Sequence, residues 1–427
     1  MKQLSLLVLA CIFAISFSAC KKELNTATVT YQEATAIYGD LEAVRNLPLN
    51  HSVQAVGNPG KVFVGADFIL LGEEEKGIHV INNSDINNPQ FTNFIDIPGN
   101  REFFVKDNYL YAESYYDLIK IDLTDLNNVQ LVSRATNILQ ETITNDNGEA
   151  LLGFSFHEVT KDIDVNDDIY DQVVTDQYVY YDFARKVIPK SAVPSSFAGN
   201  SNGNSGTVNR ITHAQDHVYV ISLNAMAIID DASGAFQTVG STSNLNFPDA
   251  METIFPYQDK LFVGSRTSMN IYDAAQPQNP TELYEFEHAT SCDPVLPTDE
   301  VAYITLRTGD FSDCPGNTNA LVVLDIENLN SPEEVDHIDM SSPYGMTVIG
   351  DRLFVGEGDN GWSIFDVTDR KRPSVIKQDD TVKAFDIIAH PTNPAIILIA
   401  GPDGLTQYTI DGENTDIDLD LNSQIEY

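Results

Sequence analysis

A short apolar run that ends in Asp or Asn recurs along the chain, and Leu321 to Asp325 (LVVLD) is the clearest copy. The eight copies begin at positions 78, 118, 178, 226, 269, 321, 362 and 407. Successive starts are 40, 60, 48, 43, 52, 41 and 45 residues apart. A repeat of forty-odd residues is typical of one propeller blade.

The flanks of each run follow one pattern, which predicts four strands per repeat. A second apolar segment precedes the run, as at 260–264, and another strand lies upstream of it, as at 252–256. Turn pairs such as Gln258-Asp259 join these two strands as a hairpin. Turn residues and usually a Pro follow the run, before a more polar outer strand. Middle strands buried on both faces give continuous apolar runs, whereas an exposed outer strand alternates.

The predicted fold is therefore all-β: a single β-propeller of four-stranded blades over residues 61–427, most simply with eight blades. Seven blades is the alternative if the third or the last repeat is incomplete. The third repeat departs most, because residues 157–177 are an insertion and 185–194 make a weak outer strand. The outer strand of the last blade is either 416–425 or, through ring closure, 28–31. We expect the Asp that ends each run to accept hydrogen bonds from turn amides, which is a structural role.

The repeated run, with LVVLD at 321–325, closely resembles that of the LVIVD-repeat family of β-propeller proteins. These proteins are common as lipoproteins of Bacteroidetes-type bacteria. The resemblance covers roughly residues 61–411. It implies the fold and says almost nothing about function.

The first residues predict export and lipid attachment. Lys2 precedes an apolar stretch over 4–17, which is too short to span a bilayer comfortably and fits a signal peptide. Ser18 and Ala19 then precede Cys20, a junction that resembles the lipobox of bacterial lipoproteins. The resemblance implies that Cys20 is acylated, becomes the new N-terminus and anchors the protein to the membrane. The alternative is a plain signal peptide with an incidental Cys.

This interpretation divides the chain into a signal peptide at 1–19, a lipid-anchored tether and lead-in at 20–60, and the propeller. A short helix is expected near 40–45 within the lead-in. Lys21 after the acylated Cys favours the outer membrane, by resemblance to lipoprotein sorting rules. Which face of that membrane carries the protein stays open.

The charge balance limits the partners. The chain has 63 acidic and 24 basic residues and a formal net charge of −39. Such a field repels phosphate backbones and anionic lipid surfaces, so it argues against nucleic-acid binding and leaves the lipid as the predicted membrane contact. The hydrophobic content of 42% fits a globular chain and not a disordered acidic one.

The chain has four cysteines. Cys11 leaves with the signal peptide and Cys20 takes the lipid, which leaves Cys292 and Cys314. Because exported proteins meet an oxidising environment, we expect these two to form a disulfide within one blade. The alternative is two free buried thiols.

A ligand site is predicted at the mouth of the central channel, where the innermost strands of the blades begin. Alignment of those strands puts a mixed polar set at one level: Glu102, Arg210, Thr253, Asp293 and Asp386, together with Gly345. The alternative is a water-filled channel whose polar groups satisfy one another.

A calcium site is the second candidate, at Asp162, Asp164, Asn166 and Asp168 in the third repeat. Oxygen ligands at alternate positions suit a hard cation, and the segment resembles the opening of an EF-hand loop. It lacks the Gly of the sixth position and the Glu of the twelfth, so an exposed acidic loop is the alternative.

No enzyme motif is present in the sequence, and His213, His288 and His390 are isolated. The single Trp also argues against a quinone-cofactor propeller, which usually repeats Trp in every blade. The sequence therefore predicts a non-catalytic binding scaffold for a protein or glycan partner at the cell envelope. The alternative is an envelope lyase or hydrolase that uses carboxylates at the channel mouth.

Overall fold

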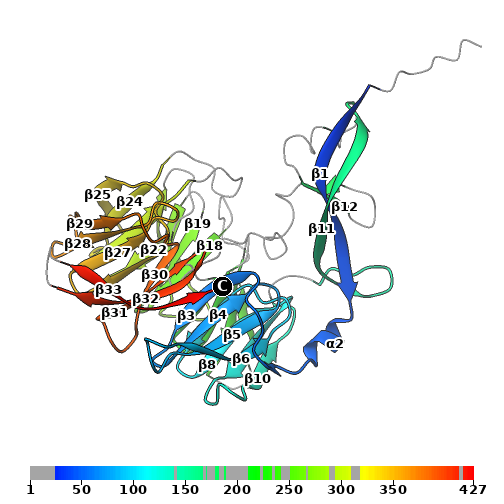
Figure 1. The fold of residues 1–427 in the computed structure, drawn as a ribbon, viewed down its shortest axis with the longest axis horizontal. Helices are drawn as coiled ribbons and strands as arrows, with labels where there is room; N and C mark the ends of the chain where they lie inside the picture. Colours follow the sequence, from blue (N-terminus) through cyan, green and yellow to red (C-terminus); the bar gives the residue numbers. More distant parts are fainter. Residues whose placement is uncertain are drawn as a thin grey trace, which may run out of the picture. The chain divides into compact units, whose positions relative to one another are not determined.

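The computed structural model describes residues 25–138, 142–166, 170, 178–181, 187–188, 210–221, 225–232, 236–241, 251–265, 268–287, 294–308, 318–412 and 417–427. The chain divides into a larger unit, Tyr38–Leu152 with Ala198–Tyr427, and a smaller unit, Met1–Ile37 with Gly153–Phe197. Strands dominate both units, which confirms the all-β class (Figure 1). In the described part of the chain no helix is long and apolar enough to span a bilayer.

In the described residues of the larger unit, seven antiparallel sheets are each built from strands consecutive in the chain. The first has β3 (Pro59–Val64), β4 (Phe68–Glu73), β5 (Gly77–Asn82) and β6 (Gln90–Asp96), with β2 (Asn50–His51) added beyond β6. The second has β7 (Phe103–Lys106), β8 (Tyr109–Ser114), β9 (Asp117–Asp122) and β10 (Gln130–Ala135). The third has β14 (Ile211–Ala214), β15 (His217–Ile221), β16 (Met226–Asp230) and β17 (Gln237–Ser241).

The remaining four sheets repeat this order. The fourth has β18 (Met251–Tyr257), β19 (Lys260–Ser265), β20 (Ser268–Asp273) and β21 (Thr281–Glu287). The fifth has β22 (Val295–Pro297), β23 (Val301–Leu306), β24 (Ala320–Asp325) and β25 (Glu333–Asp339). The sixth has β26 (Met346–Ile349), β27 (Arg352–Gly356), β28 (Trp362–Asp366) and β29 (Ser374–Asp379). The seventh has β30 (Asp386–Ala389), β31 (Ile396–Gly401), β32 (Gly404–Asp411) and β33 (Asp418–Glu426).

Seven of the eight repeated runs form the third strand of a sheet, and their terminal acids fix the turns that follow. The Asp122 carboxylate accepts the amide of Thr124 at 2.8 Å, and Asp366 accepts the amide of Thr368 at the same distance. The Thr368 amide is also the main cause of the lowered pKa of Asp366. The predicted structural role of these acids is thereby confirmed.

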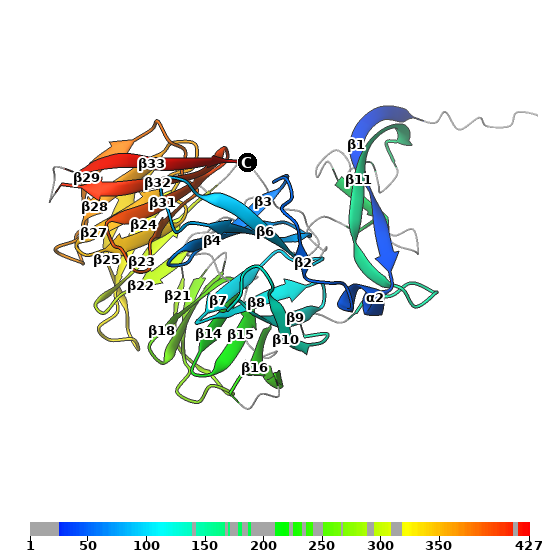
Figure 2. The same cartoon turned by 60° about the horizontal axis from the view of Figure 1, so that its bottom comes forward.

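Hydrophobic clusters join every sheet to the next. One packs Leu70 and Ile95 of the first sheet against Phe103 of the second, and six more join the other neighbouring pairs. The cluster that contains Ile69 and Leu405 joins the first sheet to the seventh. Figure 2 shows these two sheets, in blue and red, side by side. The seven sheets therefore pack in a closed succession, and the predicted β-propeller is confirmed.

The ring closes through side chains and not through exchange of a strand. The outer strand of the last blade is β33, which pairs with β32 and follows it in the chain. Of the two outer strands that the sequence left open for the last blade, the one near 416–425 is therefore correct, and 28–31 is not. Asn83 after β5 and Gln407 on β32 form a reciprocal amide pair at 2.9 and 2.8 Å across the closure.

The run of the third repeat lies in the smaller unit, so seven of the eight sheets found among the described residues make up the closed succession of the larger unit. Its run lies in β12 (Tyr178–Tyr181), which pairs in parallel with β1 (Thr26–Gly39) in a sheet of order β11-β1-β12-β13. The other two strands are β11 (Ala150–Asp164) and β13 (Val187–Ile188). Residues 157–164, expected to be an insertion, extend β11 along β1, as the contact of Thr30 with Thr160 at 2.9 Å shows.

The lead-in is more ordered than a tether. It contains β1, the helix α2 (Leu41–Arg45) and β2. The helix confirms the prediction for 40–45, and Asp40 is its N-cap, accepting the amide of Glu42 at 2.9 Å. Residues 1–24, which hold the predicted signal peptide and Cys20, lie outside the described residues.

Candidate functional site

The innermost strands of the blades begin at one common level. Glu102 immediately precedes β7, and its carbonyl accepts the amide of Glu113 on β8 at 3.0 Å. Arg210 immediately precedes β14, and its carbonyl accepts the amide of Ile221 on β15 at 2.9 Å. The backbone pairing thus puts Glu102 and Arg210 at the same position of neighbouring blades.

The other predicted residues follow the same register where they are described. Thr253 on β18 lies opposite Gly264, and Asp386 at the start of β30 lies opposite Ala400. Gly345 precedes β26, and a Cβ there would stand 1.8 Å from Oδ1 of Asp386, so only glycine fits beside this carboxyl group. Asp293 lies outside the described residues.

Two residues of this level escaped the sequence analysis. Lys61 on β3 is the residue at this level in the first blade. Its Nζ forms an ion pair with Oε1 of Glu102, across the interface of the first two blades. Glu113 is the second. It directly follows the apolar segment 109–112 on a middle strand. A carboxylate at the end of a buried apolar strand is unusual, and this was the one feature of the sequence that could have predicted Glu113 as a site residue.

The Oε1 atom of Glu102 has two partners. Besides the ion pair with Lys61, its Oε1 accepts the amide of Phe103 at 3.1 Å. The Asn100 amide nitrogen donates to the carbonyls of Glu102 and Glu113 at 3.0 and 3.1 Å, which holds the two backbones together.

Glu113 is a second buried carboxyl group at this level, and its pKa is shifted. The Glu113 residue is 8% exposed. Burial raises the pKa of Glu113 to about 7. The charges of Arg210, Arg101 and Lys61 oppose this rise and that of Glu102 adds to it.

Aromatic residues occupy the same level in the sixth and seventh blades. Tyr344 and Phe385 directly precede Gly345 and Asp386, and their rings meet edge to face with centroids 5.1 Å apart. The Arg307 guanidinium lies 4.1 Å from the centroid of the Tyr344 ring. All three side chains are partly exposed, so this part of the channel mouth presents stacked aromatic and cationic groups.

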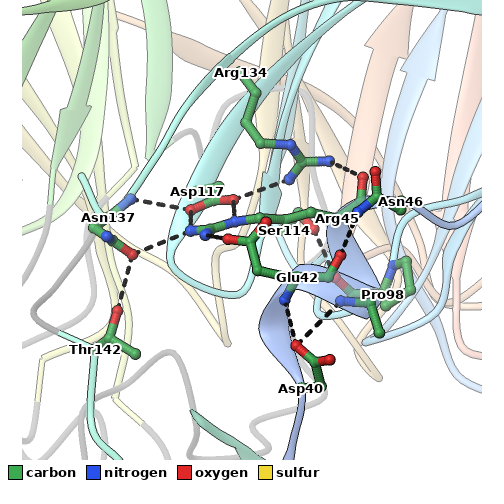
Figure 3. A network of polar contacts seen from close by, with 11 residues as sticks. Asp40, Glu42, Arg45, Asn46, Pro98, Ser114, Asp117, Arg134, Asn137 and Thr142 are labelled. Carbon is green, nitrogen blue, oxygen red and sulfur yellow. Dashed lines mark hydrogen bonds and ion pairs between the residues drawn. The ribbon is translucent and has the colours of Figure 1, made fainter. Parts of the chain in front are cut away.

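A network of polar contacts surrounds Asp117 at the start of β9. Figure 3 shows its carboxylate between Arg45 of α2 and Arg134 of β10. Arg45 donates through Nε and Nη2, both at 2.8 Å, and Arg134 donates at 3.0 Å. The adjacent Tyr116 donates its hydroxyl to the carbonyl of Leu151 at 2.7 Å. Asp117 and Tyr116 therefore contact two other segments of the larger unit, the helix α2 and the chain at Leu151.

The histidines named from the sequence serve packing where they are described. His213 Nε2 lies 3.2 Å from Oδ2 of Asp231, which also accepts the Tyr111 hydroxyl at 2.6 Å, and burial lowers the pKa of His213. His390 Nε2 lies 3.0 Å from the carbonyl of Ala66 in the first blade. His288 lies outside the described residues.

The acidic segment of the third repeat makes local hydrogen bonds. Asp162 accepts the Thr28 hydroxyl at 2.6 Å, and Asp164 accepts the amide of Asn166 at 3.0 Å. Asp168 lies outside the described residues. Among the residues that the structure describes, no group of three or more His, Cys, Asp or Glu is placed to hold a metal. Calcium therefore stays a prediction, as does the disulfide, because Cys292 and Cys314 are also outside this part.

Comparison with two solved structures whose TM-scores exceed 0.5 supports the fold. A protein of Bacteroides uniformis ATCC 8492, whose name suggests a 6-phosphogluconolactonase, matches with a TM-score of 0.53 and 9% identity over 81% of this chain and 91% of its own. A chain of the mitotic checkpoint complex matches with a TM-score of 0.51 and 9% identity over 85% and 94%. BamB from Moraxella catarrhalis gives a TM-score of 0.46 at 8% identity over 82% and 84%.

At these identities the shared property is the fold alone. No family model matches the chain. No curated protein matches it either.

Proposed function

We propose that this protein is an exported, lipid-anchored scaffold of the cell envelope that binds a protein partner with the channel-mouth face of its propeller. The observation that carries the proposal is the stack of Arg307, Tyr344 and Phe385 on that face. Arg and aromatic residues dominate the binding energy of protein interfaces, because they combine a large contact area with few degrees of freedom.

The blades make this face a fixed surface. Each inner strand is held by hydrophobic clusters on both sides, so the groups at the channel mouth keep their spacing. A pre-organised surface loses little conformational entropy when a partner docks. This property suits a scaffold whose own chain does not need to rearrange.

Lipid anchoring at the outer membrane belongs to the same proposal. The apolar stretch before Cys20 and the resemblance of the repeats to the LVIVD family support it. The acyl chains would supply the membrane contact that a chain with a net charge of −39 does not make with anionic lipid.

The test is quantitative capture of partners from native envelopes with matched variants. Tyr344→Ala and Phe385→Ala should each lose most of the protein captured by the wild type. Val375→Ala on β29, where the side chain is 51% exposed, should capture as much as the wild type. Equal capture by all three variants would contradict the proposed face.

A second candidate is an envelope enzyme of the lyase or hydrolase type. Burial raises the pKa of Glu113 to about 7, as a general acid or base requires, and Glu102 supplies a second carboxylate beside it. The test is a screen of sugar and ester substrates. If the wild type turns over any of them, Glu113→Gln should abolish that turnover, and unchanged turnover in this variant would contradict the enzyme.

A further inference from the structure

The contact between the second and third blades, the 2–3 interface, has no short chain link. Residues 136–210 separate β10 of the second blade from β14 of the third, and they include β11, β12 and β13 of the smaller unit. By contrast, residues 97–102 join β6 to β7, and residues 340–345 join β25 to β26. The 2–3 interface therefore depends more on contacts between side chains than these two interfaces do.

A tyrosine on the second strand bridges other interfaces of the ring in a common way. Tyr219, the third residue of β15, donates its hydroxyl to the carbonyl of Pro277 in the fourth blade at 3.0 Å. Tyr303, the third residue of β23, donates to the carbonyl of Arg370 in the sixth blade, also at 3.0 Å, across the 5–6 interface. Both acceptors are main-chain carbonyls, which do not titrate, so these two bonds are insensitive to pH.

The equivalent tyrosine of the 2–3 interface, Tyr111, meets a titratable cluster instead. It donates its hydroxyl to Oδ2 of Asp231 at 2.6 Å, and Lys120 donates to Oδ1 at 2.6 Å. The His213 ring lies on the third blade, with Nε2 3.2 Å from Oδ2 of Asp231 and its centroid 5.6 Å from that of the Tyr111 ring. The side chains of His213 and Asp231 are 10% and 9% exposed. Both oxygens of the carboxylate thus already accept from the second blade, with a nearly buried histidine beside them.

We infer that the 2–3 interface is an acid-sensitive joint of the ring, which loosens when His213 takes up a proton. The protonated ring would be a second cation beside Lys120, next to a carboxylate whose oxygens already have partners, and it would be shielded from water. The inference goes beyond the proposed function, because Arg307, Tyr344 and Phe385 belong to the fifth, sixth and seventh blades.

Burial gives the direction of the pH dependence. It lowers the pKa of His213 from the ordinary value of 6.5, against the hydrogen bond and the charge of Asp231. The charge of Lys106 on β7 adds to this decrease, and that of Asp216 opposes it. An open interface exposes the ring to water, so in acid the open state binds more protons than the closed state. The closed interface should therefore lose stability as the pH falls below 6.5 and keep it at neutral pH.

The experiment measures how accessible one buried position is at each of two interfaces. Val220 and Val355 are the fourth residues of β15 and β27, and they are 2% and 0% exposed. Val220 packs in the hydrophobic cluster of the 2–3 interface, and Val355 packs in that of the 5–6 interface. The second position is the matched control, because the Tyr303 bond across the 5–6 interface ends on a carbonyl.

Val220→Cys and Val355→Cys are made in the full chain and labelled with dithiodipyridine, and the label at each position is read by peptide mass spectrometry. Rates are corrected for the reactivity of a free thiol at each pH. Position 220 should be labelled about fivefold faster at pH 5 than at pH 7.5, and position 355 should show no such rise. His213→Gln added to Val220→Cys should remove the rise, because glutamine takes up no proton. His337→Gln, which replaces an exposed histidine, should leave it.

An equal rise at both positions, no rise at position 220, or a rise that survives His213→Gln would each overturn the inference. If His213→Gln does not fold, hydrogen exchange of the wild type decides. The amides of β14 and β15 should then lose more protection at pH 5 than those of β26 and β27, relative to the exchange of free peptides. Equal losses in the two pairs of strands would contradict the joint.

Discussion

The Arg45 guanidinium and the Asp117 carboxylate form a two-point pair, with Nε to Oδ2 and Nη2 to Oδ1 both at 2.8 Å. The two residues are 72 positions apart in the chain. Their pair joins a helix of the lead-in to the second blade, and the Asp117 side chain is completely buried beneath it. This contact holds the helix α2 against the second blade.

Asp117→Asn should therefore destabilise the larger unit. The substitution leaves Arg45 and Arg134 without their shared carboxylate, and breaking a buried ion pair costs about 3 kcal/mol of the free energy of unfolding. Asp351→Asn is the control, because its pair with Arg370 is exposed and should change stability by less than about 0.5 kcal/mol. Urea unfolding measures both. A similar small loss in both variants would contradict the role of Asp117.

The closure of the ring gives a second prediction. Asn83 and Gln407 are both 1% exposed, so removal of either amide takes two buried hydrogen bonds from the other, although Gln407 Nε2 also donates to Ser423 Oγ at 3.0 Å. Asn83→Ala and Gln407→Ala should each cost about 2 kcal/mol, and the double variant should cost clearly less than their sum. Strictly additive losses in a double-mutant cycle would mean that the first and last blades are not joined through this pair.

The pKa of Glu113 gives a third prediction, for stability. Its value in the folded protein is raised from 4.5 to about 7, so between these values the folded state binds more protons than the unfolded state. Stability should therefore fall as pH rises from 4.5 to 7, by about 3 kcal/mol from this group. Glu113→Gln should lack this loss and become more stable than the wild type at pH 8. Parallel stability curves for the two proteins would show that Glu113 does not titrate in this range.

Lipid attachment gives a fourth prediction. Cys20→Ser should release the protein from the membrane fraction or leave it unprocessed, because no acyl chain can then be attached. Fractionation and intact mass measure the outcome. Unchanged membrane retention together with unchanged mass would contradict the anchor.

Local sequence pattern was enough to predict most of the fold. A continuous apolar run such as 321–325 is what a middle strand buried on both faces requires, and it became β24. The same pattern misled at the third repeat, because β12 pairs with β1, which lies about 150 residues earlier. Apolar content shows that a strand is buried but does not show which strand it pairs with.

The site was predicted only in part, for a related reason. Register along the inner strands located Glu102 and Arg210, because the repeat fixes their position in each blade. Lys61 was missed because β3 begins at Pro59 and Gly60, without the apolar signature of the other inner strands. The raised pKa of Glu113 results from its burial in the folded protein, and the local sequence around Glu113 does not predict that burial.

The central claim is that the channel-mouth face binds a protein partner, and site-specific photo-crosslinking in intact cells tests it most directly. A photoreactive amino acid is placed at Phe385 on this face or at Val375 on the outer strand β29. We predict a discrete crosslinked product from position 385 and none from position 375. A product from position 375 with none from position 385 would contradict the account.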